Sequence, residues 1–202
     1  MEMKSYLKTL TLFSTLSALI FFAGCNSNNQ TKNQETAENA TYDSESLYQM
    51  VGNWVTQNGD TIRLGDLRGK IPVVSMVFTN CTFACPRIVD DIKTIKQQVP
   101  ADKKDKMVYV LITFDTERDT PERLKEFAKT MQLDDQWLLL HGDEDEVREM
   151  SMLLNVKYKK QSNGDFGHSN EITLLDTEGT MVTQVEGLGK NQKPIIDKIK
   201  AL

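Results

Sequence analysis

Residues 73–86 read Val-Val-Ser-Met-Val-Phe-Thr-Asn-Cys-Thr-Phe-Ala-Cys-Pro. The first half is an apolar, β-branched run, and the closing proline suits the first turn of a helix, so the stretch predicts a strand-to-helix junction. Cys81 and Cys85 lie in this junction, where free backbone N–H groups and the positive end of the helix dipole favour thiolates. Cysteines four positions apart can turn both sulfurs toward one point. Such a pair suits either redox exchange or the binding of a soft metal ion.

The segments around this junction alternate between strand and helix patterns. The junction itself joins a buried strand over residues 71–78 to a helix from residue 86. Further strands are predicted at 107–114, 137–140, 172–175 and 181–185, and further helices at 121–130, 143–154 and 191–200. Ahead of them, Asn58-Gly59-Asp60 between two short strand patterns predicts a β-hairpin.

This order predicts an α/β domain with a thioredoxin-like fold. Its central mixed sheet is expected to be flanked by helices and preceded by the N-terminal β-hairpin. In such a sheet, chemistry belongs at the carboxyl end of the strand that precedes the cysteines. Cys81 and Cys85 fall at that end.

The amino terminus has a different character from the rest of the chain. Lys4 and Lys8 precede an apolar run over residues 10–22, which is shorter than the roughly 20 residues of a membrane span and is typical of a secretory signal. Ala-Gly-Cys, ending at Cys25, resembles a bacterial lipobox. We therefore expect a lipoprotein signal peptide over residues 1–24 and an exported protein, anchored to a bacterial membrane through lipidated Cys25, with its domain on the extracytoplasmic side. An uncleaved signal anchor is the alternative interpretation.

Residues 25–46 are rich in Asn, Gln, Thr, Glu and Ser and poor in apolar side chains. That composition predicts a disordered tether between the membrane and a folded domain over residues 47–202. The chain carries 24 basic and 29 acidic side chains, for a net charge of −5. Without a basic stripe to neutralise phosphates, we expect no nucleic-acid partner.

With Cys25 lipidated, Cys81 and Cys85 are the two remaining thiols of an exported domain. Two such cysteines tend to pair as a disulfide in an oxidising compartment. A purely structural bridge is the less favoured interpretation, because closing so short a loop removes little chain entropy.

The chain has two histidines. His141 follows a predicted strand, and a structural role in a turn is the favoured interpretation. His168 lies in a glycine-bracketed loop over residues 164–170, which in a thioredoxin-like fold packs beside the helix start that carries the cysteines. Two thiolates and one imidazole form a soft set that suits both copper(I) and copper(II). Structural zinc usually takes four protein ligands, so copper is the favoured metal.

Three segments carry a family resemblance. They are residues 78–86, residues 115–122 (Asp-Thr-Glu-Arg-Asp-Thr-Pro-Glu), and His168-Ser169 followed by Leu-Leu-Asp at 174–176. In this order and spacing they resemble the SCO/SenC family, whose members are membrane-tethered copper proteins that help assemble the binuclear copper centre of cytochrome c oxidase. The resemblance extends from residue 47 to the carboxyl end.

The resemblance implies specific roles. Cys81, Cys85 and His168 would be the ligands of about one copper per chain, as copper(I) or copper(II). Asp115 would support the ligands or recognise a partner, with capping of the turn after its strand as the alternative. The family loop often reads Cys-Pro-Asp-x-Cys-Pro, whereas this chain has Thr82 and Phe83 in place of Pro-Asp. The change removes a negative charge beside the metal and bears on copper(II) preference and partner choice.

The ligand set and the resemblance together imply a metallochaperone that delivers copper by ligand exchange, and the resemblance implies a copper-site subunit of cytochrome c oxidase, or another copper protein, as its client. A thiol-disulfide reductase that keeps a partner's cysteines reduced is the alternative. Against it, three residues separate the cysteines where exchange enzymes have two, and no proline immediately precedes the strand at residue 172. A peroxide-reducing enzyme is a third interpretation, although a second cysteine at this spacing fits its active-site pattern poorly.

Overall fold

The computed structural model describes residues 41–202. The expected signal peptide, Cys25 and most of the expected tether lie outside the described residues. Tyr42 and Ser46, near the start of the described part, contact the domain: the Tyr42 ring meets Tyr48 edge-on, and the Ser46 hydroxyl donates to the carbonyl of Glu178. Within residues 41–202, no helix combines the length and the apolar character that a membrane crossing needs.

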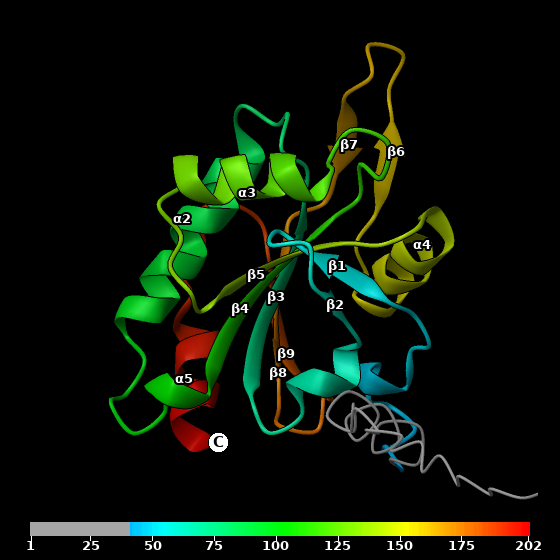
Figure 1. The fold of residues 1–202 in the computed structure, drawn as a ribbon. Helices are drawn as coiled ribbons and strands as arrows, with labels where there is room; N and C mark the ends of the chain where they lie inside the picture. The colour runs from blue at the N-terminus through cyan, green and yellow to red at the C-terminus, as the bar shows by residue number, and fades with distance from the viewer. Residues whose placement is uncertain (1–40) are drawn as a thin grey trace, which may run out of the picture.

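A seven-stranded mixed sheet forms the centre of the domain (Figure 1). In order across the sheet, the strands are β2 (Thr61–Ile62), β1 (Trp54–Thr56), β5 (Trp137–His141), β4 (Met107–Thr113), β3 (Ile71–Val77), β8 (Glu171–Leu175) and β9 (Met181–Glu186). β3, β4 and β5 are parallel, whereas β1 and β8 run antiparallel to β5 and β3. β3 and β4 are buried along their whole length, as their continuous apolar runs predict.

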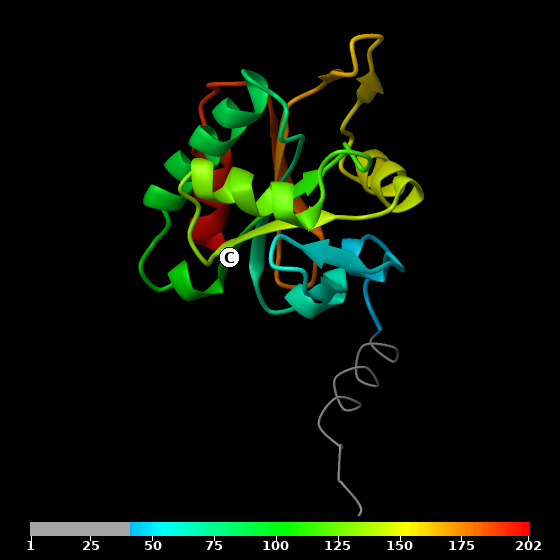
Figure 2. The same cartoon turned by 45° about the horizontal axis from the view of Figure 1, so that its top comes forward.

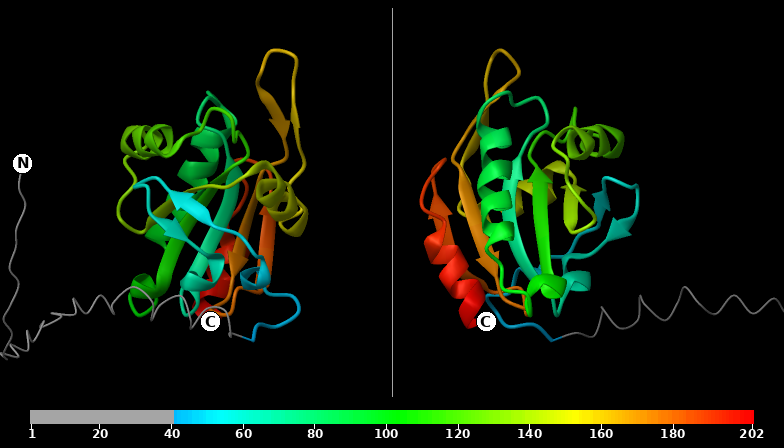
Figure 3. Two further views of the ribbon diagram at one scale, coloured as in Figure 1. Left: turned by 45° about the vertical axis from the view of Figure 1, so that its right-hand side comes forward. Right: turned by 90° about the vertical axis from the view of Figure 1, so that its left-hand side faces the viewer.

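Helices cover both faces of this sheet. α2 (Ala84–Gln97) and α5 (Lys193–Ala201) lie on one face, and α4 (Glu144–Leu153) lies on the other (Figures 1 and 3). α3 (Pro121–Thr130) contacts β5. The short 3-10 helices are η1 (Leu47–Gln49), η2 (Leu64–Leu67) and η3 (Lys104–Lys106). The expected thioredoxin-like arrangement, a mixed sheet flanked by helices, is thus confirmed.

Local sequence signals account for several of these boundaries. The predicted N-terminal hairpin is β1 paired with β2, and Gly59 in its turn has a φ of +86°, a conformation that glycine adopts without strain. Thr120 caps α3 by accepting the Arg123 N–H, and Pro121 is the first helical residue. α2 begins at Ala84 rather than at Pro86, so Cys85 lies inside the first turn of the helix.

One expected loop is a hairpin in the structure. The sequence predicts a glycine-bracketed loop over residues 164–170, but β6 (Tyr158–Lys160) pairs with β7 (Phe166–His168) in a separate two-stranded sheet. This β6–β7 hairpin projects from the main sheet beside α4 (Figures 1 and 2). Its strands are three residues long and mostly polar, so they lack the alternating apolar pattern by which strands are recognised.

Candidate metal centre

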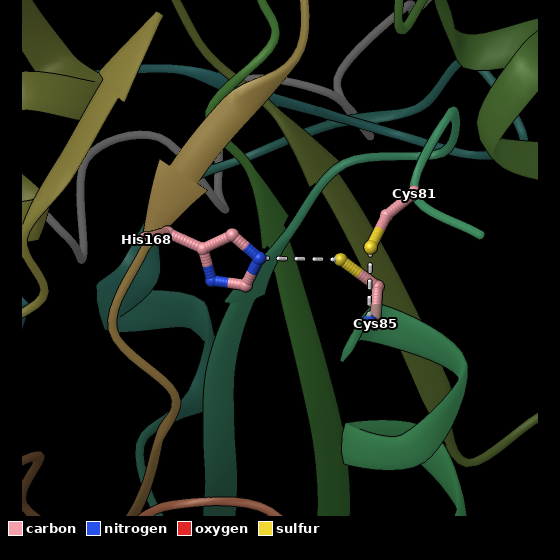
Figure 4. A group of neighbouring side chains, drawn as sticks. All are labelled: Cys81, Cys85 and His168. Carbon is pink, nitrogen blue, oxygen red and sulfur yellow. Dashed lines mark hydrogen bonds between the residues drawn. The ribbon is translucent and has the colours of Figure 1, made fainter. Parts of the chain in front are cut away.

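Three chain segments bring Cys81, Cys85 and His168 together (Figure 4). Cys81 lies in the loop after β3, Cys85 in the first turn of α2, and His168 at the end of β7. One ligand atom from each residue lies within 4.8 Å of the other two, and the Cys85 sulfur is 3.9 Å from His168 Nε2. The structure therefore places the imidazole beside both sulfurs, although it comes from a chain segment 83 residues after Cys85.

Backbone N–H groups at the strand-to-helix junction hold both sulfurs. The N–H of Cys85 donates to the Cys81 sulfur at 3.2 Å, and the N–H of Phe78 donates to the Cys85 sulfur at 3.4 Å. The hydrogen bond from the Cys85 side chain, joined by backbone N–H groups, lowers the pKa of Cys81 to about 4. Burial, together with the same hydrogen bond, raises the pKa of Cys85. The pair thus contains one accessible thiolate and one buried thiol.

The orientation of His168 is fixed from two sides. Its Nδ1 lies 2.8 Å from the carbonyl oxygen of Ser169, which can only accept, so Nδ1 carries a hydrogen and Nε2 is the nitrogen that faces the sulfurs. The rings of Phe78 and Phe114 pack against the imidazole, with centroids 6.0 and 5.0 Å away. A hydrogen bond on the remote nitrogen is the usual way in which proteins orient a metal-binding histidine.

The separations in this group suit a single ion. Metal–ligand bonds of about 2.0–2.3 Å keep ligand atoms roughly 3.5–4 Å apart around one centre, and the sulfur-to-imidazole distance of 3.9 Å falls in that range. Within residues 41–202 the group contains two sulfurs and one nitrogen, with no fourth His, Cys, Asp or Glu side chain. Thiolates and imidazole in a three-ligand set match the preferences of copper better than those of structural zinc.

Asp115 lies outside this group. Its side chain is 1% exposed, and one carboxylate oxygen accepts from Arg118 Nε. The Arg118 guanidinium lies over the ring of Phe166, 5.8 Å from its centroid. The Asp115 carbonyl also accepts the N–H groups of Arg118 and Asp119, so the residue organises the turn after β4. Its link to the ligands runs through Arg118 and the β6–β7 hairpin.

His141 also lies outside the group. It ends β5, and its Nδ1 lies 3.0 Å from the carbonyl oxygen of Asp119. This contact fits the structural role in a turn that the sequence favoured for His141.

Sequence reasoning missed Asp119. This residue is fully buried, and its carboxylate accepts hydrogen bonds from residues 79 and 113. An acidic residue between a buried strand and a helix cap was the available signal, but nothing in the sequence indicates which donors it meets.

Comparison with protein families gives one match over the folded part. The SCO1/SenC family model matches residues 40–202. An SCO2-like protein of Rickettsia prowazekii is 30% identical over 131 residues, which are 62% of this chain and 62% of that protein. The chain spans 62–64% of the length of this relative and of two others, which is less than two thirds.

Two solved structures are similar in fold. The crystal structure of a SCO1/SenC family lipoprotein from Bacillus anthracis has a TM-score of 0.67 and 26% identity, with 74% of this chain and 91% of that chain covered. The structure of Bradyrhizobium japonicum ScoI with copper bound has a TM-score of 0.62 and 25% identity, with 74% and 96% covered. The match over residues 40–202, together with this shared thioredoxin-like fold, shows that the chain belongs to the SCO1/SenC family.

Proposed function

We propose that this protein is a metallochaperone that binds one copper ion per chain through Cys81, Cys85 and His168. The observation that carries the proposal is the convergence of two sulfurs and one imidazole nitrogen within 4.8 Å. The copper bound to the related ScoI supports the choice of metal. The proposed client is the copper-site subunit of a cytochrome c oxidase or another copper protein.

The exposure of the site supports delivery by ligand exchange. Cys81 is partly exposed, so a partner's thiol or imidazole can approach an ion held there. A three-ligand site also leaves room for an incoming ligand. Phe83, between the two cysteines, is 78% exposed. A client that reaches the ion would touch this ring, which stands where the family often has an aspartate.

Copper retention tests the proposal. We expect the reduced protein to keep about one copper per chain in equilibrium dialysis, and a variant with both Cys81→Ser and Cys85→Ser to keep almost none, because hydroxyls are poor ligands for copper(I). Loss of copper from the parent protein to the level of the double variant would defeat the proposal.

We also propose that lipidated Cys25 anchors the protein to a bacterial membrane, with the domain on the extracytoplasmic side. The sequence around Cys25 supports this proposal, as does the description of the Bacillus anthracis relative as a lipoprotein. Acyl chains at one cysteine provide firm attachment, since each buried CH₂ contributes about 0.8 kcal/mol.

Membrane fractionation tests the anchor. Cys25→Ser is expected to move the protein from the membrane fraction to the supernatant, whereas Cys81→Ser should leave it with the membranes. A Cys25→Ser protein that stays in the membrane fraction would instead favour an uncleaved signal anchor.

A thiol-disulfide reductase is the second candidate, because the two thiols differ in the way that exchange requires. The Cys81 thiolate is accessible and could attack a partner's disulfide to form a mixed disulfide, while a partner thiolate leaves. The Cys85 sulfur, once deprotonated, would then displace the second partner thiolate. This role gives His168 no task. The two functions are compatible, since loading with copper(I) requires both cysteines to be reduced.

A further inference from the structure

Asp119 joins the cysteine loop to the central sheet through a buried set of hydrogen bonds. The residue is 0% exposed. Its Oδ2 accepts from the Thr79 N–H at 2.8 Å and from the Thr113 hydroxyl at 2.6 Å, and its Oδ1 accepts from the Thr79 hydroxyl at 2.5 Å. A buried carboxylate is stable only with such donors, so these bonds restrain the groups that make them.

The direction of these bonds explains why the position needs a carboxylate. The Thr113 hydroxyl already accepts the Asp115 N–H, and the Thr79 hydroxyl already accepts from Arg123 Nη2 at 3.4 Å. Each hydroxyl also donates its one hydrogen to Asp119. A carboxylate can accept all three bonds on its two oxygens, whereas an amide would present a donor NH₂ group in place of one of them.

The two threonines that donate to Asp119 belong to different segments: Thr79 to the cysteine loop and Thr113 to a strand of the sheet. Thr79 is two residues before Cys81, in the loop that follows β3, and it gives Asp119 both its N–H and its hydroxyl. Thr113 is the last residue of β4 and is not part of the cysteine loop. The next loop residue, Asn80, contacts the turn of the β6–β7 hairpin: its amide donates to the Asp165 carboxylate at 3.3 Å, in a hydrogen bond exposed to solvent. Asp119 is thus the buried attachment of the loop to the sheet.

We propose that Asp119 is a positioning residue, which holds the Cys81 loop through Thr79 so that the Cys81 sulfur stays within reach of Cys85 and His168. The inference rests on the proposed copper site, although the positioning itself can be measured without metal. Residues that orient metal ligands typically change metal affinity by about 10- to 100-fold when they are removed.

A matched pair of threonine variants tests this proposal, because Asp119→Ala would leave buried donors unpaired and endanger folding. Thr79→Val and Thr113→Val each delete one hydroxyl bond to the same carboxylate, and each leaves one N–H donor without its acceptor. Thr79→Ser keeps the hydroxyl and should restore parent behaviour. All are made in the full chain, and thermal unfolding reports the loss of stability. That loss should be at least as large for Thr113→Val, which leaves the buried Asp115 N–H unpaired, as for Thr79→Val, which frees an exposed Arg123 N–H.

The readouts are copper(II) affinity, the sulfur-to-copper(II) absorption band, and the equilibrium between the Cys81–Cys85 dithiol and oxidised glutathione. In that equilibrium the two thiols become a disulfide as one glutathione disulfide becomes two thiols. We expect Thr79→Val to weaken copper(II) binding about tenfold, shift the band and disfavour the disulfide, with Thr113→Val within about twofold of the parent.

Equal effects of Thr79→Val and Thr113→Val on these readouts would overturn the positioning role, as would parent-like behaviour of Thr79→Val. If the parent protein itself binds no copper, the proposed function falls, but a dithiol equilibrium that only Thr79→Val disturbs would still support the positioning role.

Discussion

Cys81 and Cys85 are four residues apart, yet their thiols have opposite properties. Cys81 precedes α2 and accepts hydrogen bonds from the Cys85 side chain and from backbone N–H groups, so its pKa falls to about 4. Cys85 is buried against the sheet, and that burial raises its pKa. The difference arises from their positions at a strand-to-helix junction, where one turn of chain separates solvent from the core. Copper binding must therefore displace a proton from Cys85 but not from Cys81 at neutral pH.

The low pKa of Cys81 predicts the pH dependence of its alkylation. Since the reactive form is the thiolate and Cys81 ionises near pH 4, its rate with iodoacetamide should be nearly constant from pH 6 to pH 8. A thiol with the ordinary pKa of about 8.5 would react roughly two orders of magnitude faster at pH 8 than at pH 6. Mass spectrometry of the Cys81 peptide gives the rate.

Cys85→Ala is the matched variant for this measurement. It removes the side-chain hydrogen bond that lowers the pKa of Cys81 most, so the rate should become dependent on pH. A parent rate that climbs steeply up to pH 8 would show that the Cys81 thiolate is not stabilised as described.

The β6–β7 hairpin is the element that supplies the imidazole. It is not part of the main sheet, and a two-stranded hairpin alone is marginally stable. Aromatic packing attaches it: the Phe166 ring lies 5.4 Å from Phe78 and 5.1 Å from Phe114, and Tyr158 stacks on Phe114 at 5.3 Å. The position of His168 thus depends on contacts between this hairpin and residues at the ends of β3 and β4.

Phe166→Ala tests that dependence. Losing its ring contacts with Phe78, Phe114 and Tyr158 should reduce the free energy of unfolding by about 2 kcal/mol. It should also weaken copper(II) binding about tenfold, because His168 is then held less firmly. Calorimetry and copper titration measure the two effects. Lys160→Ala, which deletes the exposed ion pair with Glu117 on the same hairpin, is the control and should change both values little. Normal copper(II) affinity in Phe166→Ala would contradict the dependence.

The elements that the sequence predicted well are those whose signals are local. β3 and β4 follow from continuous apolar runs, α3 from Thr120 and Pro121, and the first hairpin from Asn58-Gly59. The start of α2 was placed two residues late, because Pro86 is tolerated throughout the first turn and does not mark its first residue. β6 and β7 were missed because aromatic contacts with distant residues, rather than an alternating pattern, hold them in place.

The whole molecule assembles its candidate metal centre from segments that are far apart in sequence. Parallel β3 and β4 place the cysteine loop and residues 115–119 at one edge of the sheet, and the connection before β8 returns His168 to the same edge. The fold rule that sites lie at the carboxyl ends of strands predicted the place of the cysteines. The glycine-bracketed loop of the expected fold pointed to His168, and the family resemblance gave it the role of a ligand. The role of Asp119 could not be predicted, because its hydrogen bond joins residues 40 positions apart and produces no repeating pattern in the sequence.

Electron paramagnetic resonance of the copper(II) protein, recorded together with its absorption spectrum, tests most directly whether both sulfurs and the imidazole of His168 hold one ion. The parent should show a sulfur-to-copper(II) band and the coupling of one imidazole nitrogen. His168→Ala should lose that coupling and bind copper(II) at least about tenfold more weakly. His141→Asn, which keeps a donor for the Asp119 carbonyl, should match the parent. Identical spectra and affinities for His168→Ala and the parent would contradict the proposed site.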